Sequence, residues 1–185
     1  GQVFELAAMP DRFGWEAPDG SNFLVMHASV LGNRAGIYPK TTDEELRTKI
    51  APGPNLFVTS HTHRALVREI DQTLVVNIGA AGLPFDGDWR VSYGRFTWSA
   101  SQGWQAAVQR IEYDRAQAEK NLFTSGFMDE AGPFARLILV ELRMSQSLIH
   151  QWAQAYQEAF FAGEISLAES VERFLTQEKY QAHAE

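Results

Sequence analysis

Residues 55–93 read NLFVTSHTHRALVREIDQTLVVNIGAAGLPFDGDWRVSY and carry most of the information about architecture. The first five residues form a short apolar run rich in Leu, Phe and Val, typical of a strand buried on both faces. Residues 65–70 and 73–78 follow as two strand-like runs, and the two residues between them match the length of a hairpin loop. The stretch therefore predicts neighbouring strands that end in polar and glycine-rich segments.

The residues before this stretch add a strand and a helix. Residues 22–28, NFLVMHA, form a second apolar run of the same kind. Thr42 lies three residues before Glu45, a capping box that predicts a helix over 43–50, and the Pro-Gly-Pro at 52–54 ends it. Since residues 89–98 and 105–113 alternate like an antiparallel pair, residues 1–113 are predicted to form an α/β domain with a mixed sheet.

From residue 114 onward the apolar pattern becomes helical. Apolar residues recur at threes and fours between 134 and 156, and Gly163 ends this stretch. Ser166 and Glu169 form a second capping box, which predicts a last helix to about residue 177. The polar tail 178–185 is expected to be frayed. Residues 114–185 are therefore predicted to form a helical extension of the first domain.

Composition excludes several classes of protein. The 185 residues hold 16 Lys and Arg against 23 Asp and Glu, a net charge of −7, and no cysteine. Without cysteine there are no disulfides, thiolate zinc sites or catalytic thiols, which fits a reducing, cytoplasmic environment. The acidic balance argues against general nucleic-acid binding. No apolar run approaches the roughly 18 residues of a membrane span.

Three histidines indicate metal chemistry. His27, His61 and His63 each follow the end of a predicted buried strand. In open α/β sheets ligands bind at the carboxyl ends of the strands, so these imidazoles are expected at one edge of the sheet. Two residues apart in an extended chain, His61 and His63 would face the same way. At a strand-to-loop junction they would instead diverge toward two neighbouring ions.

The segments around these histidines resemble the calcineurin-like metallophosphoesterases, in particular the small bacterial and archaeal phosphodiesterases. That branch reads G-H-T-H and then a strand ending N-P-G-S-x-G-x-P-x-D-G-D-x-R-x-x-Y, similar to residues 60–63 (SHTH) and 77–93. Residues 25–29 (VMHAS) are similar to the family's H-G-[ST] motif. The resemblance covers residues 1 to about 115. Its departures, at 28, 60, 78 and 80–81, leave the histidines in place.

The resemblance implies the second half of a four-layer α/β/β/α sandwich and two-metal hydrolysis of phosphoesters. His27 and His61 would bind one of two divalent ions about 4 Å apart, and His63 would bind the other. Imidazole ligands favour transition metals, so Mn is expected foremost, with Fe, Ni and Zn as the other candidates.

Three further residues are candidates for supporting roles. Asn77 is a candidate acceptor for an imidazole N–H in the outer shell of the site. Arg34 and Arg90 are candidates for phosphate contacts, because a guanidinium binds phosphate with two parallel hydrogen bonds.

The family's D-x-H, G-D-x-x-D and G-N-H-[DE] motifs do not occur in these 185 residues. We therefore expect a metallophosphoesterase that a missing N-terminal half completes, acting on a small phosphoester substrate, including a nucleotide-like one. The 185 residues alone are expected to be inactive. The alternative is a non-catalytic interaction module that uses residues 114–185 to form a homo-oligomer or to bind a partner.

Overall fold

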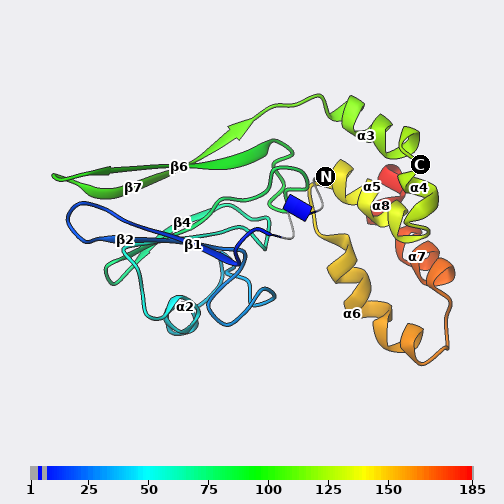
Figure 1. Cartoon of the computed structure of the whole chain (residues 1–185). Helices are drawn as coiled ribbons and strands as arrows, with labels where there is room; N and C mark the ends of the chain where they lie inside the picture. The colour runs from blue at the N-terminus through cyan, green and yellow to red at the C-terminus, as the bar shows by residue number, and fades with distance from the viewer. Residues whose placement is uncertain (1–3, 6–7, 185) are drawn as a thin grey trace. The chain divides into compact units, whose positions relative to one another are not determined.

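A five-stranded mixed sheet carries the candidate histidines. The computed structural model describes residues 4–5 and 8–184. The strands of this sheet are, in chain order, β1 (Arg12–Glu16), β2 (Asn22–Met26), β3 (Leu56–Thr59), β4 (Leu66–Ile70) and β5 (Thr73–Asn77). They lie in the order β1-β2-β3-β5-β4. Figure 1 shows β1, β2 and β4 of this sheet. Strands β2, β3 and β5 are parallel, whereas β1 and β4 run antiparallel at the two edges. The predicted α/β class with a mixed sheet is confirmed.

A helix packs on one face of this sheet. Helix α2 (Asp43–Ile50) begins after Thr42, whose hydroxyl accepts a hydrogen bond from the backbone N–H of Glu45, so the predicted capping box is formed. The side chains that bury this face are apolar and come from the helix, the strands and the loop before the helix. They are Ile37, Leu46, Ile50, Phe57, Ile70 and Val75.

A β-hairpin packs on the other face. It consists of β6 (Val91–Ser99) and β7 (Gly103–Ile111), which form a two-stranded antiparallel sheet of their own. Phe96 and Trp104 of the hairpin pack against buried Leu56, Val58 and Val76 of the larger sheet. Because alternate residues of β3 point to opposite faces, this strand contributes to both cores and is buried throughout.

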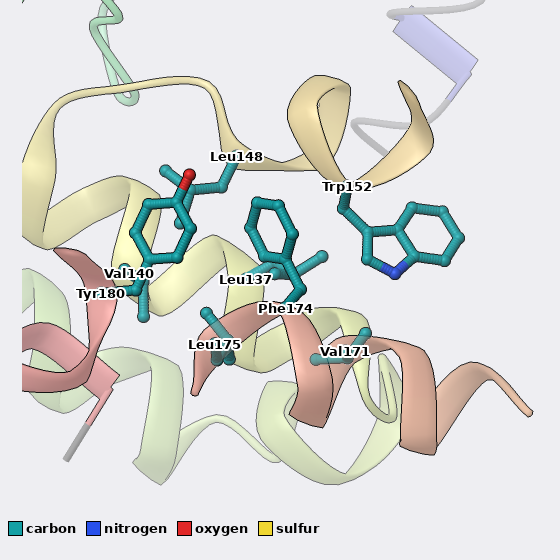
Figure 2. Close-up of a cluster of buried hydrophobic side chains, with 8 residues drawn as sticks. All are labelled: Leu137, Val140, Leu148, Trp152, Val171, Phe174, Leu175 and Tyr180. Carbon is teal, nitrogen blue, oxygen red and sulfur yellow. The ribbon is translucent and has the colours of Figure 1, made fainter. Parts of the chain in front are cut away.

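The remaining described residues form a second compact unit. The first unit comprises residues up to 82 together with 91–111, and the second comprises 83–90 together with 112 onward. The helices of the second unit are α3 (Arg115–Thr124), α4 (Phe127–Glu130), α5 (Phe134–Met144), α6 (Leu148–Phe161), α7 (Leu167–Leu175) and α8 (Glu178–Ala184). Figure 2 shows the apolar core that four of them share. Its members are Leu137, Val140, Leu148, Trp152, Val171, Phe174, Leu175 and Tyr180.

Three features differ from the sequence-based expectations. The tail forms helix α8 where fraying was predicted, because Tyr180 is buried in the helical core and its hydroxyl donates to Gln151 Oε1 at 2.9 Å. The single helical stretch ending at Gly163 is interrupted at Ser145, which adopts a left-handed conformation with φ of 54°. Strand β1 was not predicted, since its residues are all exposed and lack the pattern of a buried strand.

The loop 83–90 groups with the helices of the second unit. Within the second unit, the backbone N–H of Gly87 donates to the carbonyl of Ser145 at 3.1 Å. The ring of Trp89 lies 5.8 Å from that of Tyr113. These contacts hold part of the glycine-rich segment to the helical unit.

In the part of the chain that the structure describes, no helix has the length and apolar character needed to cross a membrane.

Candidate metal centre

Two of the three candidate histidines meet at the carboxyl edge of the sheet. His27 follows the end of β2 and His61 lies two residues beyond the end of β3, and these strands are parallel neighbours. The Nε2 atom of His27 and the Nδ1 atom of His61 are 2.9 Å apart. The two rings meet edge to face, with centroids 4.9 Å apart and an interplanar angle of 74°. Nε2 of His27 and Nδ1 of His61 therefore face each other.

Backbone hydrogen bonds explain this approach. The carbonyl of His27 accepts from the backbone N–H groups of Ser60 and His61, at 3.2 and 3.0 Å. The hydroxyl of Thr59 lies 2.8 Å from the same carbonyl and 2.7 Å from that of Ala28. The two strand ends are thus joined by the main chain, and the imidazoles meet because their backbones do.

The surroundings of His61 favour a neutral ring. Burial lowers the pKa of His61, and the neighbouring charges of His27 and His63 lower this pKa further. A neutral imidazole offers a nitrogen lone pair, which is the form that binds a metal ion. Since the side chain of His27 is exposed, the pair is open to solvent on that side.

His63 takes a different path from its neighbour. Its backbone N–H donates to the carbonyl of Ser60 at 2.8 Å, and its φ of 54° is left-handed. The side chain therefore leaves a turn and not an extended strand. Among the described residues, no three His, Cys, Asp or Glu side chains gather closely enough to hold a metal ion.

Asn77 supports the loop that bears the histidines. It is fully buried, and its side-chain amide donates to Thr62 Oγ1 at 2.7 Å and to the Ile37 carbonyl at 3.3 Å. Its side-chain oxygen accepts from the backbone N–H of Gly79 at 3.0 Å. These bonds differ from the expected one to an imidazole. Asn77 instead acts on the histidine loop through Thr62, the residue between His61 and His63.

The segment after β5 is tied to the start of β6. Gly79 has a φ of 79°, and a side chain there would bring a Cβ to 2.2 Å from Ser92 Oγ. That hydroxyl donates to the Ile78 carbonyl at 2.6 Å and accepts from the backbone N–H of Ala80 at 3.0 Å. Glycine is therefore required at position 79 by both conformation and space.

The two candidate arginines lie in different environments. Arg34 is exposed in the loop between β2 and α2. Arg90 belongs to the second unit and forms a two-point ion pair with Asp88, with Nε–Oδ1 and Nη2–Oδ2 distances of 3.0 and 2.7 Å. The guanidinium of Arg90 is thus engaged by a carboxylate two residues away.

Other residues of the site were not singled out from the sequence. Thr59 and Thr62 order the two strand ends, and Gly36 with Lys49 holds the adjacent loop. Of these residues, only Thr62 could have been singled out from the sequence, because it lies between two histidines. The sequence gives no indication of a role for Lys49, because a lysine near the end of an amphipathic helix is normally solvated.

Comparisons of sequence found no relatives. No protein-family model matches the chain, and no curated protein matches it either.

Comparison of structure found solved structures that match part of this chain. The hypothetical protein PH1004 from Pyrococcus horikoshii OT3 matches with a TM-score of 0.56 and 15% identity, over 69% of this chain and 50% of that chain. Vps29 from Chaetomium thermophilum matches with a TM-score of 0.35 and 14% identity, over 60% of this chain and 63% of that chain. A double mutant of Vps29 from Entamoeba histolytica matches with a TM-score of 0.33 and 15% identity, over 60% and 67% of the two chains. The match to the archaeal protein shows a shared fold, and it spans half of that protein's length.

Proposed function

We propose that this chain is part of a metal-dependent phosphoester hydrolase. The observation that supports this proposal is the convergence of His27 Nε2 and His61 Nδ1, 2.9 Å apart, at the carboxyl edge of a parallel β-strand pair. This edge is where open α/β sheets bind their ligands. The resemblance of the flanking motifs to calcineurin-like metallophosphoesterases gives the reaction class.

The donor set suits a transition metal. His27 and His61 would supply one nitrogen each to a first ion, and His63 would supply a ligand to a second ion. Imidazoles favour Mn, Fe, Ni or Zn over Mg or Ca. When bound, such ions polarise phosphoryl oxygens and activate water. We propose that a segment preceding these 185 residues supplies the carboxylate and amide ligands, as the resemblance implies.

The substrate side of the proposal involves Arg34. A phosphoester substrate would bring negative charge to the site, and a guanidinium is the side chain best suited to bind it. Arg34 is exposed in the loop that follows His27 and is the first candidate for this contact.

The test uses the full-length protein with Mn²⁺ and bis(4-nitrophenyl) phosphate. We expect hydrolysis, and we expect His61→Ala to reduce it by at least about 100-fold, since even losing an outer-shell partner of a metal site costs 10–100-fold. His150→Ala is the matched control, because His150 is exposed on α6 in the second unit. Release of nitrophenolate measures the rate.

Equal turnover in His61→Ala and the unsubstituted protein would contradict the metal assignment. A full-length protein that binds no Mn²⁺ and hydrolyses no ester would favour the alternative, a non-catalytic interaction module.

A further inference from the structure

A buried lysine lies beside the candidate metal centre. Lys49, on the last turn of α2, has a relative exposure of 8%. Its ammonium group donates to the carbonyl of Gly36 at 2.6 Å and pairs with Glu45 Oε1 at 2.6 Å. A buried charge is costly unless its hydrogen bonds are satisfied. Here the charge joins the helix to the loop that leaves His27.

The same residue also holds the other end of that loop. The backbone N–H of Val30 donates to the carbonyl of Lys49 at 3.0 Å. The loop is therefore fastened to α2 three residues after His27, and again at Gly36. Ile37, the next residue, is fully buried in the core between α2 and the sheet.

Gly36 packs directly against the histidine loop. A Cβ built on Gly36 would lie 2.6 Å from Thr62 Cγ2 and 2.8 Å from His61 Cδ2, so no larger residue fits without displacing one of them. The adjoining carbonyl of Ile37 accepts from Thr62 Oγ1 at 3.2 Å. The segment 36–37 is thus a surface against which the His61 ring rests.

We propose that Lys49 is a positioning residue for the histidine pair. By fixing the Gly36 carbonyl, Lys49 holds the 36–37 segment against His61 and so keeps Nδ1 of His61 aligned with Nε2 of His27. The inference rests on the proposed function only in assigning metal binding to the histidine pair. The alignment itself is a property of the protein without metal.

A merely structural lysine would have a different signature. Its loss would lower the stability of the α2 side of the sheet, and the ring pair would stay as it is. The readout must therefore report on the imidazoles themselves as well as on folding.

The test compares Lys49→Met with Lys40→Met in the full-length protein. Methionine keeps an apolar stem of similar length without the donor, and Lys40 is an exposed lysine of the same loop. Imidazole ¹⁵N signals at pH 8, without metal, report on the hydrogen bond between the rings. We expect Lys49→Met to shift the His27 and His61 signals and to weaken Co²⁺ binding about tenfold or more. Lys40→Met should change neither.

Unchanged ring signals in a folded Lys49→Met protein would overturn the proposal. If that variant does not fold, Gly36→Ala decides, because it leaves Lys49 in place and pushes on His61 and Thr62. Unchanged ring signals in Gly36→Ala would also overturn the proposal. A protein that binds no Co²⁺ would contradict the proposed function, and the ring signals would still decide whether Lys49 positions the pair.

Discussion

At the scale of single residues, the site depends on side chains that never touch the proposed metal. The amide of Asn77 joins three separate segments, since it bonds to Thr62, to the Ile37 carbonyl and to the Gly79 backbone. Thr62 lies between His61 and His63, and Ile37 follows Gly36. A fully buried amide with all these bonds formed holds the loop in one arrangement.

Asn77→Ala is expected to destabilise the first unit. The substitution leaves the backbone N–H of Gly79 without its side-chain acceptor and Thr62 without a donor. Leaving such groups unsatisfied costs about 1–3 kcal/mol. Asn33→Ala, in the exposed loop after β2, is the control and should stay within about 0.5 kcal/mol. The free energy of unfolding of both variants is measured by urea denaturation. Equal urea midpoints for Asn77→Ala and Asn33→Ala would contradict a stabilising role of the Asn77 amide.

The approach of His27 and His61 was predictable from the sequence, whereas the residues that support this pair were not. His27 and His61 stand out because each follows an apolar run and because imidazole is a common metal ligand. Lys49, Gly36 and Thr59 act through main-chain carbonyls and close approach, and a carbonyl has no signature in a sequence. The side-chain amide of Asn77 donates to the hydroxyl of Thr62, a contact between residues 15 positions apart that the sequence does not indicate.

At the scale of elements, one buried carboxylate links two helices. Glu141 on α5 is 2% exposed, and its Oε1 atom accepts from the backbone N–H groups of Leu148 and Ile149 at 2.6 and 2.9 Å. These are the first two residues of α6, whose N-cap Ser147 makes no side-chain capping bond. Glu141 therefore caps α6 from the neighbouring helix.

The capping role has a pH dependence with a definite sign. Burial raises the pKa of Glu141, and the two backbone bonds oppose the shift only in part. The folded state therefore holds the proton more tightly than the unfolded state. The stability that protonation contributes is complete below the usual glutamate pKa and is lost as the pH rises through the raised, folded-state pKa.

We expect the stability difference between the unsubstituted protein and Glu141→Gln to change with pH. Glutamine also accepts both N–H bonds and carries no charge, so the unsubstituted protein should lose stability relative to Glu141→Gln as the pH rises from 4 to 8. Glu141→Ala, which removes the acceptor, should be less stable than Glu141→Gln by about 1–3 kcal/mol. Denaturant unfolding across this pH range tests both statements. A difference that stays constant with pH would contradict the first.

Elements with local start signals were predicted well. Helix α2 and helix α7 begin where capping boxes stand, at Thr42 and Ser166. The break between α5 and α6 was missed because the apolar stripe continues through Ser145. That break includes the left-handed Ser145 and the cap from Glu141, and the cap is a contact between two helices that has no local sequence signal.

At the scale of the whole molecule, the chain has separate cores in its two units. The helical core around Trp152 and Tyr180 belongs to the second unit, and the cores on both faces of the sheet belong to the first. Multi-domain chains often unfold in more than one step. Residues 83–90 group with the second unit, and the Gly87–Ser145 hydrogen bond that joins them to the helices has no signature in the sequence.

Substitutions in the two cores are expected to act on different transitions. Tyr180→Ala removes an aromatic ring from the helical core and should cost the second unit about 3–5 kcal/mol. Val75→Ala empties part of the core between α2 and the sheet and should lower mainly the transition of the first unit. Differential scanning calorimetry separates the two effects. A single transition that both substitutions shift alike would show that the units unfold together.

The contact between His27 and His61 also determines how the pair changes state. At 2.9 Å, one ring nitrogen holds the hydrogen atom of the bond and the other holds the lone pair. A cation that took both nitrogens would need two lone pairs, so this hydrogen would have to leave first. It would leave as a proton while the far nitrogen of the same ring takes up a proton from solvent, so that both rings stay neutral. Loading the pair is therefore a change of tautomer in the donor ring, with no net release of a proton.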